Sequence, residues 1–328
     1  MKICVVGAGA IGGWMGVLLS RLPDVQLSVL ARGETLKALH AQGLRMSDAQ
    51  GDHTVQVVAC DNAADLGAQD LIVLAVKAPA LQQVVPQIAP MMTPTTQVLT
   101  AMNGVPWWFL QGFGGPWANR VLSSVDPQGR LAQAIPARQI IGCVVHSSCA
   151  MRAPGHVQHH FGHGLIVGEP SGVNSAATQR VHQRLQEAGF QTTLSPCIQQ
   201  DTWYKLWGNM TMNPVSALTG ATADRILSDP LVRAFCSAAM SEAQAIGARI
   251  GCPIAQSPEE RHAITAKLGA FKTSMLQDVE AGRAIELDAI VGAVREIGQR
   301  LGVATPNVDA LLGLTRLMGQ VRGLYPRA

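Results

Sequence analysis

The first hundred residues alternate short apolar runs with stretches of helical periodicity. The apolar runs are residues 3–6, 26–30, 71–76 and 97–100, and the helical stretches are residues 10–21 and 34–42. Because the runs lack polar alternation and are separated by helices, they are typical of parallel strands that are buried on both faces. Strand-like patches return at residues 140–145 and 157–167. The pattern therefore predicts an α/β fold with a doubly wound parallel sheet.

The pattern changes in the second half of the chain. Residues 103–136 are rich in Gly, Pro and Trp and predict an extended loop region with short helices. From about residue 197, long helical patterns rich in Ala, Leu and Met run to the C-terminus, and strand signals disappear. We therefore expect two domains that meet near residue 197, the first α/β and the second all-α.

The composition indicates a folded protein with a large core. Of the 328 residues, 48% are hydrophobic and only 14% are charged, which excludes a disordered chain. The net charge of +3 gives no sign of a nucleic-acid-binding surface. The seven cysteines form no Cys-x-x-Cys pair, so we expect neither a disulfide framework nor a zinc site. We expect instead small buried thiols in a reducing compartment.

An uncharged stretch at residues 3–20 resembles a signal peptide or a membrane span. Five glycines interrupt this stretch, however, and the chain still begins at Met1. No other uncharged stretch approaches the roughly 20 apolar residues that span a bilayer. We therefore expect a soluble cytoplasmic protein without a membrane partner.

The opening residues contain a glycine motif between a strand and a helix. Gly7, Gly9 and Gly12 follow the spacing Gly-x-Gly-x-x-Gly, which is typical of dinucleotide-binding sites. The first glycine permits a tight turn, the second lets a pyrophosphate approach, and the third lets the helix pack against the sheet. The alternative is a tight strand–helix turn without a ligand. We assign cofactor binding to the whole loop, which comprises Gly7, Ala8, Gly9, Ala10, Ile11 and Gly12.

Polar residues follow three further strands. Arg32 stands after the second strand, where an acidic residue would accept the ribose hydroxyls of NAD. Its guanidinium suits the 2′-phosphate of NADP(H), unless it is a solvated charge or pairs with Glu34. Lys77 and Asn103-Gly104 follow the next two strands, at the edge where doubly wound sheets bind ligands. We expect them to line the nicotinamide end of the site, although Asn-Gly is also a common turn.

One helical face of the C-terminal half carries amine and amide groups. Lys205, Asn209 and Asn213 stand at i, i+4 and i+8 among apolar neighbours, which predicts one half-buried face. A bound polar substrate would supply the hydrogen-bond partners that such groups need. A lysine whose pKa is lowered by desolvation can protonate a carbonyl oxygen as hydride reaches the carbon. The alternative is that Lys205 extends to solvent and Asn213 caps a helix end before Pro214.

Two further segments offer polar side chains. Residues 274–288 predict an amphipathic helix and a turn that present Ser274, Asp278 and Glu286, with a solvated helix face as the alternative. The run GHVQHHFGHG contains four histidines, at positions 156, 159, 160 and 163. Because neighbouring strand residues point to opposite faces, we do not expect this run to bind a metal ion.

Together these segments resemble the ketopantoate reductase family. The resemblance is carried by GAGAIGG at residues 7–13, by Arg32, Lys77 and Asn103-Gly104, by KLWGNMTMNPVSALTG at residues 205–220 and by SMLQDVEAGRAIELD at residues 274–288. It covers nearly the whole chain and implies an N-terminal Rossmann domain and a helical C-terminal domain. Residues 1–197 are then the NADP-binding domain, and residues 198–328 are the substrate-binding and catalytic domain.

The resemblance also implies an activity and residue roles. Enzymes of this family reduce 2-dehydropantoate, a small 2-oxo acid, to pantoate with NADPH in pantothenate synthesis. The resemblance implies that Lys205 is the general acid and that Glu286 takes part in catalysis by fixing the substrate. The further substrate-binding residues are then Asn209, Asn213, Ser274 and Asn103, and Lys77 and Asn103 lie between cofactor and substrate. We expect no nucleic-acid partner, and we allow for a homodimer.

The chain also departs from the family pattern. After Asn103-Gly104, residues 105–130 form a longer and more aromatic connection than the family suggests, and Ala80 replaces a common Gln. The aromatic side chains either pin a long loop by packing or form a wall for a bulkier, more apolar substrate. The alternatives to ketopantoate are therefore another 2-oxo acid or an imine. A non-catalytic NADP-binding regulator is the alternative outside enzymes.

Overall fold

The computed structural model describes residues 1–327 and divides the chain into two compact units. The first unit comprises residues 1–102, 108–119 and 130–198, and the second comprises residues 103–107, 120–129 and those from 199 onward. Two short segments of the loop region therefore group with the helical second unit, although they lie within the first half of the chain. One of them contains Asn103.

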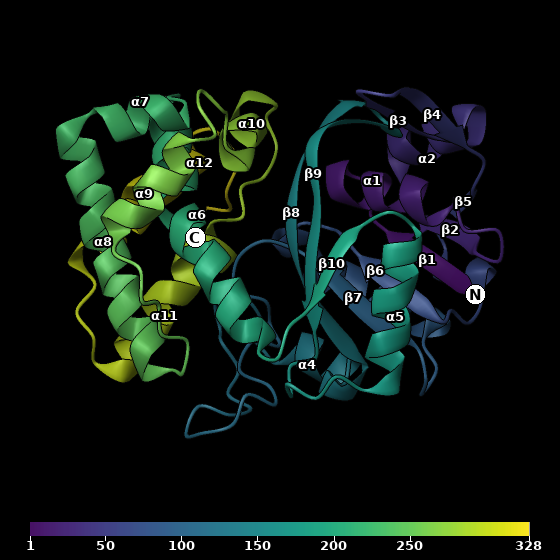
Figure 1. The fold of residues 1–328 in the computed structure, drawn as a ribbon, viewed down its shortest axis with the longest axis horizontal. Coiled ribbons are helices and arrows are strands. Elements are labelled where there is room, and N and C mark those ends of the chain that lie inside the picture. Colours follow the sequence, from purple (N-terminus) through teal and green to yellow (C-terminus); the bar gives the residue numbers. More distant parts are fainter. Residues whose placement is uncertain (328) are drawn as a thin grey trace. The chain divides into compact units, whose positions relative to one another are not determined.

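A single mixed sheet forms the frame of the first unit (Figure 1). Within residues 1–327 its ten strands are β1 (Lys2–Val6), β2 (Gln26–Leu30), β3 (Leu44–Asp48), β4 (Gly51–Val55), β5 (Val58–Cys60), β6 (Leu71–Leu74), β7 (Gln97–Ala101), β8 (Ile140–Ala153), β9 (His156–Gly168) and β10 (Gln191–Leu194). The spatial order is β4-β3-β9-β8-β7-β6-β1-β2-β5, and β10 also pairs with β9. The strands from β5 to β8 in this order are parallel, whereas β8–β9 and β3–β4 are antiparallel.

The parallel part of the sheet has the strand order of a dinucleotide-binding fold. Its neighbours are β5, β2, β1, β6, β7 and β8, which is order 3-2-1-4-5-6 when these strands alone are numbered along the chain. The direction of the connections reverses between β1 and β6. Ligands of such sheets bind at the carboxyl ends of the strands beside this switch point.

Helices cover the sheet because its strands are apolar on both faces. The helices of the first unit are α1 (Ala10–Leu19), α2 (Gly33–Gln42), α3 (Leu81–Val84), α4 (Arg130–Ala134) and α5 (Ala176–Glu187). Trp14 and Met15 of α1 and Leu185 of α5 share one buried core with Val5 and Val73 of the strands. Close packing of α1 against β1 fixes the position of the turn that joins them.

The structure differs from the sequence prediction mainly at the margins of the sheet. The hydrophobic pattern does not predict β3, β4, β5, β10 or α5, because β4 and β10 lack apolar runs, β5 has only three residues and α5 is mostly polar. The predicted doubly wound parallel sheet is present, and the sheet also contains antiparallel pairs, because β8 and β9 form a long antiparallel hairpin. The strand predicted at residues 71–76 ends at Leu74, and the helix predicted at residues 10–21 ends at Leu19.

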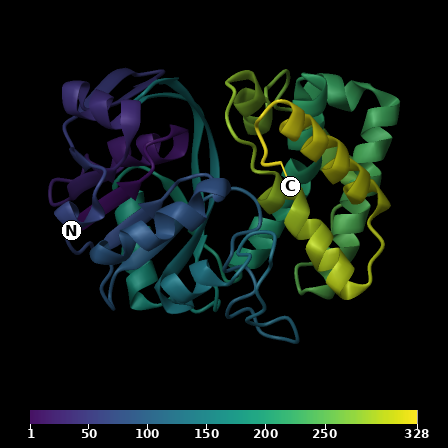
Figure 2. The ribbon, with the colours of Figure 1, turned by 180° about the vertical axis from the view of Figure 1, so that it is seen from behind.

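The second unit is built of helices, which Figure 2 shows from behind. They are α6 (Ile198–Thr219), α7 (Ala223–Ser228), α8 (Pro230–Arg249), α9 (Pro258–Ala266), α10 (Ser274–Glu280), α11 (Ala293–Leu301) and α12 (Pro306–Val321). Met212 and Val215 of α6 share a buried core with Cys236 of α8 and Leu311 of α12. The interpretation that Asn213 ends a helix is wrong, because α6 continues through Pro214 to Thr219.

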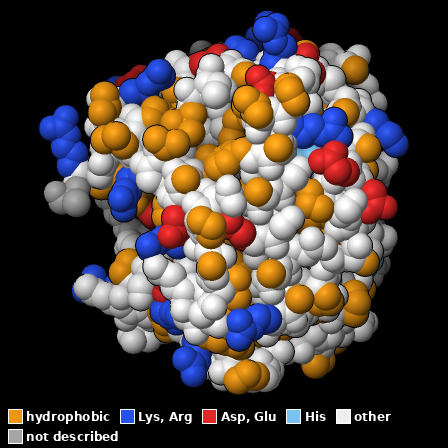
Figure 3. All heavy atoms as spheres, turned by 90° about the vertical axis from the view of Figure 1, so that its left-hand side faces the viewer, with side chains coloured by type: hydrophobic (Ala, Val, Ile, Leu, Met, Phe, Trp, Pro, Cys, Tyr) orange, Lys and Arg blue, Asp and Glu red, His pale blue; other side chains and the backbone are white. Residues whose placement is uncertain are grey.

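The surface of the helical unit is mixed in character. On the face drawn in Figure 3, hydrophobic side chains occur in small groups among polar and charged ones. The most exposed large hydrophobic residues of this unit include Leu231, Leu314, Leu317 and Val321. Such scattered exposure is ordinary for a folded protein. None of the helices within residues 1–327 has the length and hydrophobicity that crossing a membrane requires.

Candidate functional site

The carboxyl end of β1 leads directly into the glycine motif. Gly7 has φ +91°, which glycine adopts without strain, and its amide donates to the Leu30 carbonyl at 3.1 Å. A Cβ on Gly7 would lie 2.6 Å from Val76 Cγ1, and a Cβ on Gly12 would lie 2.1 Å from the Gly7 carbonyl oxygen. Neither position can accept a side chain unless the backbone moves. The turn therefore lies tightly against the carboxyl end of β6, beside the switch point of the sheet.

The N-terminus of α1 is open at Gly9. This residue is exposed, and a Cβ built on it would meet no atom within 4 Å. The bond from Gly13 N to Gly9 O, at 2.8 Å, starts the helical ladder, so the amides of Ala10, Ile11 and Gly12 have no acceptor inside the helix. Such amides, together with the helix dipole, attract a phosphate. The loop has the room and the donors that a pyrophosphate requires.

Arg32 lies exposed at the carboxyl end of β2, where α2 begins. Its Nη1 donates to Gln83 Oε1 at 3.1 Å. Glu34, the acidic residue that could have neutralised it, pairs instead with Lys37, with 2.8 Å between nitrogen and oxygen. The other N–H groups of the guanidinium can therefore serve an anion. Lys77 is half-buried and follows the end of β6.

Lys205 and Asn103 lie together in the second unit. Lys205 is in the second turn of α6, and its Nζ donates to Asn103 Oδ1 at 2.8 Å. Both residues are half-buried. They are 102 positions apart, so the contact depends on the segment 103–107, which the chain contributes to this unit from the loop region. An ammonium group whose direction is fixed in this way is suited to deliver a proton to one point.

Asn209 and Asn213 continue the same face of α6. Asn213 is buried, and its Nδ2 donates to Ser274 Oγ at 3.4 Å. Asn209 is half-buried, and its side-chain amide has no hydrogen-bond partner among residues 1–327. Ser274 is exposed at the start of α10. Asp278 has a structural contact, since its carboxylate accepts from Arg283 Nε at 3.1 Å and closes the turn after α10.

A π-helical turn, Asp288–Gly292, follows Glu286. Glu286 is half-buried. A π turn interrupts the regular helical ladder and is frequent at functional sites. Here the Ala289 carbonyl accepts the N–H of Val105 at 2.7 Å. This bond attaches the segment that carries Asn103 to the segment that carries Glu286.

Two carboxylates fix the backbone around the π turn. The two oxygens of Glu296, on α11, accept the N–H groups of Ser123 and Ser124, each at 2.8 Å. Asp288 Oδ1 accepts the hydroxyl proton of Tyr325 at 2.7 Å. Burial raises the pKa of Asp288, and the hydrogen bond from Tyr325 opposes this effect. The sequence gives no signal for these contacts, because each joins residues that are far apart along the chain.

Three of the five aromatic residues between Gly104 and residue 130 are packed inward. Trp107, Trp108 and Phe109 are all buried. The indole Nε1 of Trp108 donates to Thr100 Oγ1 at 3.0 Å, and a Cβ on Gly142 would lie 2.5 Å from the Trp108 ring. Buried rings with such contacts contribute to packing. These residues favour the interpretation of a packed loop over that of a wall for a bulky substrate.

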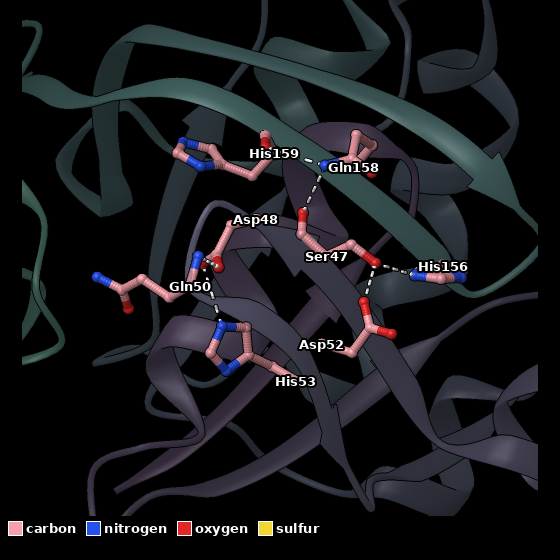
Figure 4. Close-up of polar contacts among 8 residues, drawn as sticks. All are labelled: Ser47, Asp48, Gln50, Asp52, His53, His156, Gln158 and His159. Carbon is pink, nitrogen blue, oxygen red and sulfur yellow. Dashed lines mark hydrogen bonds and ion pairs between the residues drawn. The ribbon is translucent and has the colours of Figure 1, made fainter.

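The histidines of β9 stabilise the edge of the sheet. His156 Nε2 lies 2.7 Å from Ser47 Oγ, which donates to Asp52 Oδ1 at 2.5 Å (Figure 4). Burial lowers the pKa of His156 and two nearby arginines lower it further, against the opposing effect of Asp52, so the neutral ring is favoured. His159 stacks on Trp14, with 5.7 Å between ring centroids. Among residues 1–327, no three His, Cys, Asp or Glu side chains are grouped as metal ligands would be.

Two family models match the chain in sequence. The model described as "Ketopantoate reductase PanE/ApbA" matches residues 3–172, and its counterpart described as "Ketopantoate reductase PanE/ApbA C terminal" matches residues 197–319. The chain belongs to the ketopantoate reductase family. The 2-dehydropantoate 2-reductase of Mesorhizobium japonicum is 42% identical over 325 residues, which cover 99% of this chain and 100% of that protein.

Solved structures of this family have the same fold. A crystal structure from Ralstonia solanacearum, assigned to the ketopantoate reductases, is 56% identical, covers 99% of both chains and gives a TM-score of 0.95. A ternary structure of D-mandelate dehydrogenase with NADH and anilino(oxo)acetate is 20% identical, covers 99% of this chain and 100% of that chain and gives a TM-score of 0.85. At that identity the likeness shows the fold alone. The predicted family and fold class are confirmed, and the chain is an oxidoreductase that uses a nicotinamide cofactor.

Proposed function

We propose that the chain reduces 2-dehydropantoate to pantoate with NADPH, as a step of pantothenate synthesis. The observation that carries the proposal is the bond from Lys205 Nζ to Asn103 Oδ1, at 2.8 Å, on a half-buried helix face. On the same face, this proton donor adjoins the side-chain amides of Asn209 and Asn213. A small 2-oxo acid with hydroxyl groups matches such a set of donors and acceptors.

The proposed reaction adds a hydride to the ketone carbon and a proton to the ketone oxygen. The glycine loop would hold the pyrophosphate of a reduced nicotinamide cofactor, and this cofactor would supply hydride to the ketone carbon. As the carbonyl becomes an alcohol, the Lys205 ammonium gives its proton to the oxygen. The neutral amine is then reprotonated from water. Asn209, Asn213 and Ser274 bind the substrate's polar groups, and Glu286 fixes its orientation, so that one face of the ketone meets the hydride.

The cofactor in this proposal is NADP(H), and all of its assigned residues except Asn103 belong to the first unit. The loop from Gly7 to Gly12 binds the pyrophosphate, Arg32 binds the 2′-phosphate, and Lys77 and Asn103 serve the nicotinamide end. Residues 1–197 then form the NADP-binding domain, and residues 198–328 form the substrate-binding and catalytic domain. The exposed Gly9 and the unpaired amides behind it support this assignment.

Replacement of Arg32 by Ala is expected to raise the Kd of NADPH by roughly 10- to 100-fold, because hydrogen bonds to a charged phosphate are lost. The Kd of NADH should change by less than about 2-fold, since NADH lacks that phosphate. Fluorescence titration of both cofactors measures the two values. Gln83→Ala is the matched control, because it removes only the present partner of Arg32. An equal loss for both cofactors would refute the role of Arg32.

The substrate is tested by steady-state rates on ketopantoate and on bulkier 2-oxo acids. We expect kcat/KM for ketopantoate to exceed that for an aromatic 2-oxo acid by about 100-fold or more, since a polar site rejects an analogue that leaves its groups unpaired. A higher kcat/KM for the aromatic 2-oxo acid would show that ketopantoate is not the preferred substrate, although the reaction would still be the reduction of a 2-oxo acid. Cofactor binding without turnover of any 2-oxo acid or imine would indicate a regulator.

Location and assembly also belong to the proposal. All seven cysteines are free thiols, and burial raises the pKa of Cys4 to about 11, so it is unreactive. Free thiols suit the cytoplasm, which is where we place the protein.

A homodimer would give a mass of twice 34.7 kDa in sedimentation equilibrium. A mass of 34.7 kDa at every concentration would exclude it.

A further inference from the structure

The turn that carries Asn103 rests directly on the π turn. Val105 donates its N–H to the Ala289 carbonyl at 2.7 Å, and Gly104 has φ +81°. A Cβ on Gly104 would lie 2.6 Å from the Ala289 carbonyl oxygen and 2.7 Å from the Ala289 carbonyl carbon. Both are backbone atoms, which cannot yield as the end of a flexible side chain can. A side chain at position 104 would therefore displace either its own turn or the π turn.

The π turn provides a fixed support for this contact. Its ladder runs from Ala293 N to Asp288 O, a wider register than that of an α-helix. Tyr325 holds the turn through its hydroxyl, which donates to Asp288 Oδ1 at 2.7 Å. The adjoining backbone is also held, because Ile285 N donates to the Leu324 carbonyl at 3.1 Å. The Ala289 carbonyl thus occupies a defined position.

The loop region has a second attachment to the same helical segment. Ser123 and Ser124 donate their N–H groups to the carboxylate of Glu296, which follows the π turn on α11. Segments 103–107 and 120–129 are therefore both fixed on residues 288–301. The first of these segments begins with Asn103, whose side-chain oxygen accepts from Lys205 Nζ at 2.8 Å. A continuous chain of contacts links the Ala289 carbonyl to the Lys205 ammonium.

We propose that the contact of Gly104 with the Ala289 carbonyl positions Lys205 for proton transfer, by fixing the Asn103 oxygen that orients the ammonium. This inference rests on the proposed function. Gly104 does not touch the reacting atoms in this account, so it is a positioning residue. A displacement of about 1 Å in Asn103 would misdirect the donated proton, and errors of that size can cost roughly 100-fold in rate.

The direct test is Gly104→Ala, measured by kcat, by KM for ketopantoate and by the solvent deuterium isotope effect. We expect kcat to fall by roughly 10- to 100-fold with KM changed by less than about 3-fold, since proton delivery is impaired more than binding. The isotope effect should rise, because proton transfer becomes slower. Gly114→Ala is the matched control. Gly114 has the same φ of +81° but nothing within 4 Å of its Cβ position, so its rate should not change.

A double-mutant cycle separates positioning from general damage. If Gly104 acts through Asn103, then Gly104→Ala should have no further effect in an Asn103→Ala background. Additive losses would overturn the inference and leave the proposed function intact. If Asn103→Ala and Lys205→Ala both retain near-normal turnover, Lys205 is not the proton donor and the inference fails, whereas absence of ketopantoate reduction by the original chain would refute the proposed function itself.

A second variant covers the case in which Gly104→Ala does not fold. Tyr325→Phe removes the hydroxyl that holds Asp288 and fills no new space. It should lower kcat by a few-fold, raise the solvent isotope effect, and have no further effect in the Asn103→Ala background. An unchanged isotope effect in a folded Tyr325→Phe variant would overturn the inference.

Discussion

Replacement of Lys205 by Ala is expected to lower kcat for ketopantoate by about 10²- to 10⁴-fold, the range that general acids contribute. The oxygen would then have to take its proton from water instead of from an ammonium group that Asn103 orients. The Kd of NADPH should stay within about 2-fold of its original value, because the proposed pyrophosphate and 2′-phosphate contacts belong to other residues. Stopped-flow hydride transfer and fluorescence titration measure the two quantities.

Lys267→Ala is the control for this experiment. Lys267 lies exposed beside the end of α9 in the same unit, so its loss removes an equal charge from the surface. The kcat of the Lys267→Ala variant for ketopantoate should equal that of the original chain. If Lys205→Ala keeps full turnover, the proton donor lies elsewhere. If the original chain binds NADPH but has no turnover to lose, the regulator becomes the better account.

Substitutions at two glycines of the motif are expected to have opposite effects on stability. Gly9→Ala should raise the Kd of NADPH by roughly 10- to 100-fold, because its methyl group enters the space assigned to the pyrophosphate. Its unfolding free energy should hold or rise by up to about 1 kcal/mol, since Gly9 has an ordinary backbone conformation, with φ −74°. Urea denaturation and cofactor titration together measure these effects.

Gly12→Ala should instead destabilise the first unit. Its Cβ would lie 2.1 Å from the Gly7 carbonyl oxygen and 3.0 Å from Ala75 Cβ. The helix would have to move away from the sheet, at a cost of about 2 kcal/mol or more. NADPH binding should fall as well, because the amides of α1 would shift. Tight NADPH binding by Gly9→Ala would contradict the assigned cofactor site.

The inner strands of the sheet could be predicted from the sequence because each of them is marked by a run of neighbouring apolar residues. The runs at residues 3–6 and 71–76 are apolar without alternation, which only a strand covered on both faces explains well. The edge strands β4 and β10 carry no such signal, since their residues are half-buried or exposed. β8 and β9 pair antiparallel because the chain reverses at Gly155, which has φ +68°. The pattern of apolar residues does not indicate this tight turn.

For the candidate site, the shared helix of three residues could be predicted, and the contacts between distant segments could not. Helical spacing alone indicates that Lys205, Asn209 and Asn213 share a face, and α6 has them in one helix. The partner of Lys205 could not be derived, because 102 residues separate it from Asn103. The π turn was equally hidden, since nothing in the composition of residues 288–292 distinguishes it from an α-helix.

Chemical rescue of Lys205→Ala with small primary amines shows whether Lys205 is the proton donor. The cavity left by the side chain should admit methylamine or ethylamine in its protonated form. If Lys205 is the donor, these amines restore turnover in a saturable manner, and the rescue depends on the acidity of the ammonium, as general acid catalysis requires. Absence of rescue by every amine tested, in a folded variant that still binds NADPH, would contradict this role of Lys205.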